Sequence, residues 1–314
     1  MRLVVIVFLG ALAGFLYGSY TDGFIFSQKI CLFAGLTLIM PSLFKFELRD
    51  VALLWRYRRV MLKGFVLNYV VLPLIALGIG LLSGDFGVAG GVMMLALFSG
   101  GGMVMHWIKR SGGDTSLGFL LLFVNVLAIS LSLLMLHLFA TFTSGYFGIE
   151  YDETITVKRF AWAVAELLIV IPFVASRFVR LIPGAVAWFE RYKKIVSQGS
   201  IFIILFYLFG LQSSQSLVDI YDFEPELFAA SAVAVVGFYA ATYVVARAAF
   251  DLSSPQEIAA FWHTLTRYLT LALVIATFTV GTFGASMLLP VMFGYLVQIP
   301  LSVVVSRRFG ASQG

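Results

Sequence analysis

The sequence has little charge and a single cysteine. Only 12% of its 314 residues are Asp, Glu, Lys or Arg, whereas a soluble domain carries about 25%. With 61% hydrophobic residues, the chain has too little polar surface to coat a water-soluble globule. The lone Cys31 excludes an intrachain disulfide and a cysteine cluster for a metal ion. These shortages indicate a polytopic membrane protein.

The sequence also lacks the motifs of an enzyme. It contains no phosphate-binding glycine loop, no zinc motif and no nucleophile paired with a base. We therefore expect no catalysis, no cofactor and no metal site. The net charge of +5 does not indicate nucleic acid, because the basic residues lie in short loops beside apolar segments.

Ten apolar stretches have the length of about 20 residues that a bilayer requires. We expect the first to be a retained helix rather than a cleaved signal peptide, because no small-residue cleavage site leads into a soluble domain. The approximate limits of the ten are 3–20, 25–44, 64–82, 88–107, 116–139, 160–182, 196–216, 227–250, 258–282 and 285–305.

The charges of the gaps between these stretches alternate along the chain. Basic residues gather in the gaps 45–63 and 177–194, after the fourth span and at the C-terminus, whereas the other gaps are mainly acidic. Under the positive-inside rule, this pattern places both termini in the cytoplasm. We expect a multi-pass protein of the bacterial inner (plasma) membrane, surrounded by lipid.

The count of ten spans predicts an internal repeat. Five spans bring the chain to the outside, so spans six to ten run with the opposite topology, as in an inverted repeat. We expect a first five-helix repeat at 1–140, an extracytoplasmic linker at 141–159 and a second five-helix repeat at 160–314.

Two of the spans are interrupted at corresponding places in the two halves. Gly100, Gly101 and Gly102 interrupt the fourth, and each glycine costs about 1 kcal/mol against alanine in a helix. The ninth contains the polar run His263–Thr270, which includes a fixed charge. Since broken helices near mid-membrane hold substrate in many secondary transporters, both interruptions indicate a binding site.

Short motifs along most of the chain resemble the superfamily of bile acid:sodium symporters and arsenical-resistance (arsenite efflux) transporters. The matching segments are Gly35-Leu36-Thr37-Leu38, Asn68-Tyr69 before Pro73, Gly102-Met103-Val104, Trp107, Gly113-Asp114, Asn125, Arg267 with Leu271-Ala272-Leu273, and Gln298-Ile299-Pro300. The resemblance implies an all-α protein with core and panel domains, broken fourth and ninth helices that cross at the binding site, and alternating access.

The residues that carry ions in this superfamily are replaced here. In the arsenite transporters, which this chain resembles, a cysteine and a glutamate occupy the positions that align with Gly100 and Gln298. Arsenic(III) needs a thiolate ligand, which Gly100 cannot supply. His263 and Arg267 stand where the sodium symporters have a glutamate and a glutamine. We therefore expect neither arsenite export nor sodium binding at the inherited sites.

Arg267 is the most informative charge. An arginine at mid-membrane costs at least about 2.5–3.5 kcal/mol, and its planar guanidinium suits a carboxylate or phosphate. It would either bind an anionic substrate or form a structural tie with Glu166 or with carbonyls of the unwound helices. In the place of a lost cation, it would act as a tethered surrogate for that cation in either case.

Several other polar residues in the spans are candidates for the site. His263 precedes Arg267 by four residues, so we expect the two to share a helix face. His263 and Glu166 are candidates for proton coupling, while His263 would otherwise be a neutral hydrogen-bonding histidine and Glu166 an interfacial carboxylate. The expected substrate-binding set is Asn68, Gly100, Gly101, Gly102, Asn125, His263, Thr264, Arg267, Thr270 and Gln298.

These patterns predict a secondary active transporter that moves a small solute, an organic anion, by alternating access and without the usual sodium sites. The alternative is a membrane receptor or complex subunit that kept the fold and lost transport. A passive channel is a third reading, which would give rates well above those of a carrier.

Overall fold

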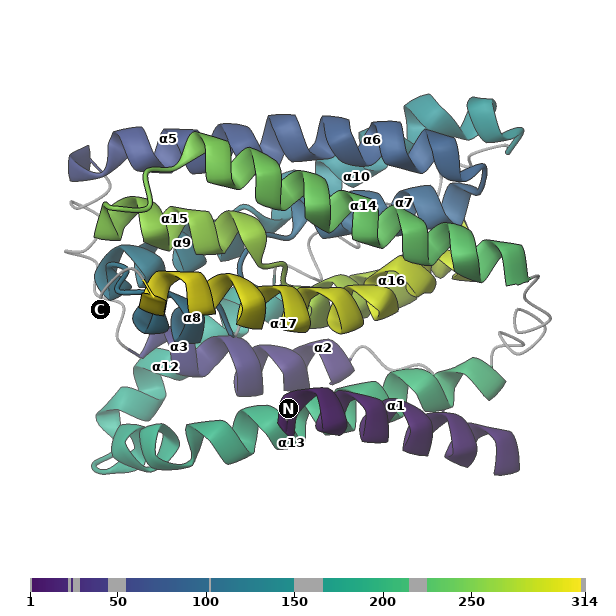
Figure 1. Ribbon diagram of the computed structural model, residues 1–314. Helices are drawn as coiled ribbons and strands as arrows, with labels where there is room; N and C mark the ends of the chain where they lie inside the picture. The colour runs from purple at the N-terminus through teal and green to yellow at the C-terminus, as the bar shows by residue number, and fades with distance from the viewer. Residues whose placement is uncertain are drawn as a thin grey trace. The chain divides into compact units, whose positions relative to one another are not determined.

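The computed structural model describes residues 2–21, 24, 29–44, 55–101, 103–149, 166–214 and 225–311. In these ranges every regular element is a helix, and one isolated pair of extended residues is the only strand-like contact (Figure 1). The chain divides into two compact units, Met1–Lys45 with Lys158–Glu224 and Phe46–Val157 with Pro225–Gly314. Each unit therefore combines segments from both halves of the sequence.

The first unit is built around the pairing of α1 with α13. A Cβ atom added to Gly14 on α1 would collide with the backbone carbonyl of Phe206 on α13. Small residues of this kind let the backbones of membrane helices approach closely. The elements of this unit are α1 (Arg2–Tyr20), α2 (Lys29–Ala34), η1 (Gly35–Ile39), α3 (Met40–Leu43), η5 (Glu166–Val170), α12 (Ile171–Leu181) and α13 (Ala185–Ser214).

The second unit surrounds a central helix, α7 (Phe86–Leu97), in which every residue is buried. A helix that is apolar on all sides belongs in a core, and α6, α10, α14, α16 and α17 all contact α7. The elements around it are α5 (Arg58–Val66), η3 (Leu67–Val71), α6 (Leu72–Ser83), α8 (Val104–Arg110), α9 (Thr115–Leu127), α10 (Ile129–Thr143), η4 (Ser144–Phe147), α14 (Pro225–Ala249), α15 (Pro255–Leu265), α16 (Leu269–Phe283), η7 (Ala285–Met287) and α17 (Leu288–Ala311).

Several helices are long and apolar enough to cross a membrane. Four qualify within the described residues, namely Arg58–Ser83, Ile129–Phe147, Pro225–Ala249 and Leu288–Phe309, and a bent pair, Ile171–Leu181 with Ala185–Tyr192, brings the number to five. Large apolar side chains are exposed on their outer faces, as in a protein surrounded by lipid. The expectation of a polytopic membrane protein agrees with this, while ten spans and the inverted repeat remain predictions.

At two places the helices differ from the expected stretches. The fifth stretch, 116–139, is divided at Ala128 into α9 and α10, and the Ser132 hydroxyl beside this point donates to the carbonyl of Leu97 at 3.0 Å. The basic gap 177–194 is almost wholly helical, with only Ile182–Gly184 between α12 and α13. Charge alone overestimates a loop because long basic side chains can reach water from within a helix.

Candidate functional site

Two broken helices of the second unit make the candidate site. The chain leaves the helical conformation after Leu97 in α7 and resumes it at Val104 in α8. It leaves it again after Leu265 in α15 and resumes it at Leu269 in α16 (Figure 1). Both breaks lie where the sequence is interrupted, within the stretches 88–107 and 258–282. Gly102 lies outside the described residues.

The two extended segments pair with each other. Ser99 and Arg267 form an isolated antiparallel bridge, in which the Gly100 amide donates to the Thr266 carbonyl at 2.8 Å and the Tyr268 amide donates to the Phe98 carbonyl at 2.9 Å. Backbone groups freed by a break inside a membrane must find partners within the protein. Here the backbone groups freed by each break bond to those freed by the other. We call the place where the two extended segments meet the crossing.

Glycine is required at this crossing for conformation and for space. Gly100 has φ of 77° and Gly101 has φ of 141°, values that L side chains rarely adopt. A Cβ atom on Gly100 would lie 2.8 Å from Nδ1 of His263, and one on Gly101 would lie 3.2 Å from the carbonyl oxygen of Arg267. The glycines therefore allow the two segments to approach closely.

Gln298 of α17 holds the extended backbone of Arg267. Its Oε1 accepts the Arg267 amide proton, and its Nε2 donates to the Arg267 carbonyl at 3.2 Å. The same Oε1 accepts from the Tyr239 hydroxyl at 2.8 Å. One side-chain amide thus satisfies the two backbone groups of Arg267 that the bridge leaves unpaired.

Arg267 is 2% exposed, and its guanidinium lies among neutral oxygens. Nη1 donates to Oδ1 of Asn68 at 2.9 Å and to the carbonyl of Ala96 at 3.2 Å, and Nη2 donates to the carbonyl of Thr264. Ala96 and Thr264 are the next-to-last residues of α7 and α15, so the positive charge lies at the negative ends of two helix dipoles.

None of the carboxylates in the described part of the second unit lies at the crossing. Its acidic residues lie at helix ends instead, where Asp85 and Asp114 cap α7 and α9 and Glu257 pairs with Lys63 at 2.9 Å. No group of three or more His, Cys, Asp or Glu residues gathers as a metal site within the described ranges. Arg267 therefore has carbonyl and amide oxygens as partners, which is one of the two structural ties that the sequence allows.

His263 is buried and forms two hydrogen bonds that are separate from those of the Arg267 side chain. Its Nε2 lies 2.9 Å from the carbonyl of Gly118, and its Nδ1 lies 3.2 Å from Nδ2 of Asn125. Since a carbonyl only accepts, the proton is on Nε2, and Nδ1 accepts from the amide. The expectation of one helix face shared with Arg267 is wrong, because α15 ends at Leu265 and Arg267 is extended.

The remaining expected residues are divided between the units. The Thr270 hydroxyl is 3.0 Å from the Tyr295 hydroxyl. Thr264 is fully buried, and within the described ranges its hydroxyl has no hydrogen-bond partner. Glu166 is an exposed residue at the start of η5 in the first unit. The structure thus brings Asn68, Thr264, Arg267 and Gln298 together.

The sequence pattern missed two participants. Ser99 forms the bridge to Arg267, and its buried hydroxyl has no hydrogen-bond partner among the residues that the structure describes. Tyr239 of α14 reaches Gln298 from a span that otherwise carries no obvious site residue. The position of Ser99 directly before the glycines was an available signal, whereas a tyrosine in an apolar helix was not.

A comparison with known proteins identifies the family of this chain. The model of the Sodium Bile acid symporter family matches residues 32–218, more than half of the chain. The match includes Asn68, the described glycines and Asn125, and it ends before Arg267 and Gln298. No curated protein matches the chain. The resemblance stated from the short motifs is confirmed, and the chain belongs to the sodium bile acid symporter family, a family of membrane transporters.

Proposed function

We propose that this protein is a secondary active transporter of a small organic anion, that it works by alternating access, and that it binds no sodium at the crossing. The observation that carries the proposal is the buried charge of Arg267 between the ends of α7 and α15. Membership of the family supports a membrane transporter, and the charge of Arg267 argues against sodium binding at the crossing.

Arg267 takes the place that a mobile cation would need. In broken-helix transporters, unwound carbonyls and the C-terminal ends of half-helices coordinate the cation. Here the carbonyls of Ala96 and Thr264 and the amide oxygen of Asn68 already accept from the guanidinium. A second unit charge about 4 Å away would meet a repulsion of about 4 kcal/mol at an effective dielectric constant of about 20. Arg267 therefore acts as a tethered cation.

The same charge favours an anionic substrate. The crossing carries a fixed positive charge, and three of its buried polar atoms lack a partner in the described residues: Oγ of Ser99, Oγ1 of Thr264 and Nε of Arg267. Hydroxyl and guanidinium donors suit the oxygens of a carboxylate, a sulfonate or a phosphate. Because Arg267 is 2% exposed, an anion reaches these donors only when the crossing opens during the transport cycle.

The division into units supports alternating access. Unit one holds the first two predicted spans of each half, and unit two holds the remaining three of each half. Such a division suits a mechanism in which one bundle moves against the other around a fixed site. In this proposal the larger unit, which contains the crossing, is the core domain and the smaller unit is the panel domain.

We also propose His263 as the candidate for proton coupling. A second proton on Nδ1 would face the Asn125 amide group that now donates to it, so protonation requires that amide to rotate. Glu166, in the other unit, is the second candidate. The proposal predicts that uptake of an anion responds to a proton gradient and that His263→Gln abolishes the response.

Uptake into proteoliposomes tests the proposed function. We would reconstitute the full chain and measure accumulation of radiolabelled cholate and succinate with sodium or potassium as the only external cation. The proposal expects accumulation in both salts and none for Arg267→Ala, with Arg110→Gln as a matched control at an exposed helix end. Uptake that survives in Arg267→Ala would overturn the anion site, and a properly folded wild type without flux for any anion would favour the receptor alternative.

A further inference from the structure

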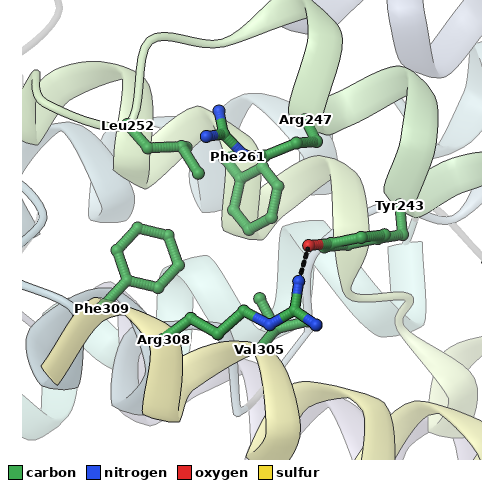
Figure 2. Close-up of a pocket in the computed structure, with 7 residues that line it drawn as sticks. All are labelled: Tyr243, Arg247, Leu252, Phe261, Val305, Arg308 and Phe309. Atoms are coloured by element: carbon green, nitrogen blue, oxygen red, sulfur yellow. Dashed lines mark hydrogen bonds between the residues drawn. The ribbon is translucent and has the colours of Figure 1, made fainter. Parts of the chain in front are cut away.

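A second cationic site lies away from the crossing, at the C-terminal ends of α14 and α17. A pocket of about 260 Å³ is lined by Tyr243, Arg247, Leu252, Phe261, Val305, Arg308 and Phe309 (Figure 2). Pockets for drug-sized ligands have about 300–1,000 Å³. This one therefore has room for a headgroup and the beginning of an attached chain, rather than for a whole amphiphile.

Two arginines supply the charge of this pocket. In Figure 2 their side chains lie on opposite sides of Phe261, and both are exposed. Nη1 of Arg308 donates to the Tyr243 hydroxyl at 3.0 Å, which orients its guanidinium. Neither Arg247 nor Arg308 forms an ion pair within the described residues. Both therefore have donors available for the oxygens of an anion.

The acidic groups near the pocket do not cancel this charge. The carboxylate of Glu257 is paired with Lys63 at 2.9 Å. Hydrogen bonds from the amide and hydroxyl of Ser253 lower the pKa of the Asp251 carboxyl, and Lys63 and Arg247 lower it further. Among the described residues, Asp251 is thus the one carboxylate that interacts with Arg247, and Arg308 has no such neighbour there.

The other walls of the pocket are apolar. Phe261 and Val305 are buried, and the rings of Phe261 and Phe309 lie 5.9 Å apart between centroids. On the outer surfaces of α14 and α17, Val244 is 64% exposed and Val304 is 53% exposed. Each valine lies about one turn before the arginine of its helix. The change from exposed valine to arginine marks the level at which hydrocarbon gives way to headgroups.

We propose that this pocket binds the phosphodiester headgroup of an anionic phospholipid from the leaflet at this end of the helices. The two guanidinium groups would hold the phosphate oxygens, while the apolar walls would contact the first carbons of an acyl chain. Basic pockets between membrane helices are suited to such headgroups. The bound lipid would link the ends of α14 and α17 beside α15, which leads into the crossing.

Thermal unfolding of the full chain in detergent tests this site. Dioctanoyl phosphatidylglycerol is expected to raise the Tm in a saturable manner, and dioctanoyl phosphatidylcholine is not. Arg247→Gln and Arg308→Gln should each weaken the apparent affinity about tenfold, a loss of about 1.4 kcal/mol. Arg308→Lys should retain part of the binding, and Arg110→Gln, which removes an exposed arginine outside the pocket, should leave it unchanged.

Two further measurements complete the test. One uses a variant that should strengthen lipid binding, and the other compares the lipid with inorganic phosphate. Asp251→Asn removes the carboxylate that interacts with Arg247 and should strengthen binding of phosphatidylglycerol, so the proposal does not depend only on losses. Inorganic phosphate should give less stabilisation than the lipid at equal concentration, because it does not contact Leu252 and Phe309. An equal rise with phosphatidylcholine, an equal rise with phosphate, or unchanged affinity in both glutamine variants would overturn the proposal.

Discussion

Arg267 donates from Nη1 to Oδ1 of Asn68 at 2.9 Å, and the two residues are 199 positions apart in the chain. This bond joins the break between α15 and α16 to the π-helical turn η3. Asn68 is 4% exposed, so its amide oxygen has given up water for the guanidinium. The pair thus connects the buried charge of Arg267 with η3, whose Asn68 helps to stabilise that charge.

Asn68→Leu is expected to lower the stability of the protein. Hydrogen bonds to charged groups contribute about 1.5–3 kcal/mol, and the substitution leaves the Arg267 guanidinium with one acceptor fewer in a buried place. The Tm in detergent should fall accordingly. Gln198→Leu, an amide of α13 in the first unit, is the control and should change the Tm much less. Equal effects of the two variants would argue against a special role for the pair.

Arg267→Gln is expected to make the protein sensitive to sodium. The substitution removes the tethered charge and leaves the oxygens of Asn68, Ala96 and Thr264 free to bind a mobile cation. Replacing potassium chloride by sodium chloride should raise the Tm of the variant and leave the wild type unchanged. A wild type that requires sodium for stability or uptake would refute the tethered cation.

Gly101→Ala is expected to destabilise the crossing. An L side chain at φ of 141° costs about 1–3 kcal/mol, and its Cβ would lie 3.2 Å from the backbone of Tyr268. Gly78→Ala is the matched control, because a Cβ there meets nothing within 4 Å and the residue lies inside α6. The control should be neutral or stabilising by about 0.4–1 kcal/mol. If both variants melt alike, the close approach at Gly101 is unimportant.

Gln298→Leu is expected to be more damaging than Gln298→Glu. Leucine leaves the buried amide and carbonyl of Arg267 without partners, at about 1–3 kcal/mol for each group. Glutamate still accepts from the amide and places a negative charge near the guanidinium. The order of the two Tm values checks this prediction, and a leucine variant as stable as the glutamate variant would contradict it.

The sequence was sufficient for the features that depend on local chemistry. A composition poor in charge requires lipid, and glycines beside polar residues in an apolar stretch predict a broken helix. Both breaks, after Leu97 and after Leu265, follow from this. Arg267 also stands out by itself, because a charge inside an apolar stretch is costly wherever the helix lies.

Only the tertiary structure decided which groups stabilise that charge. The helical period places His263 beside Arg267, but the break turns the two side chains to different partners, Asn125 in one case and Asn68 in the other. The pocket of Arg247 and Arg308 joins the ends of two helices that are more than fifty residues apart. Long-range contacts of this kind depend on how helices pack, and no local pattern in the sequence contains that information.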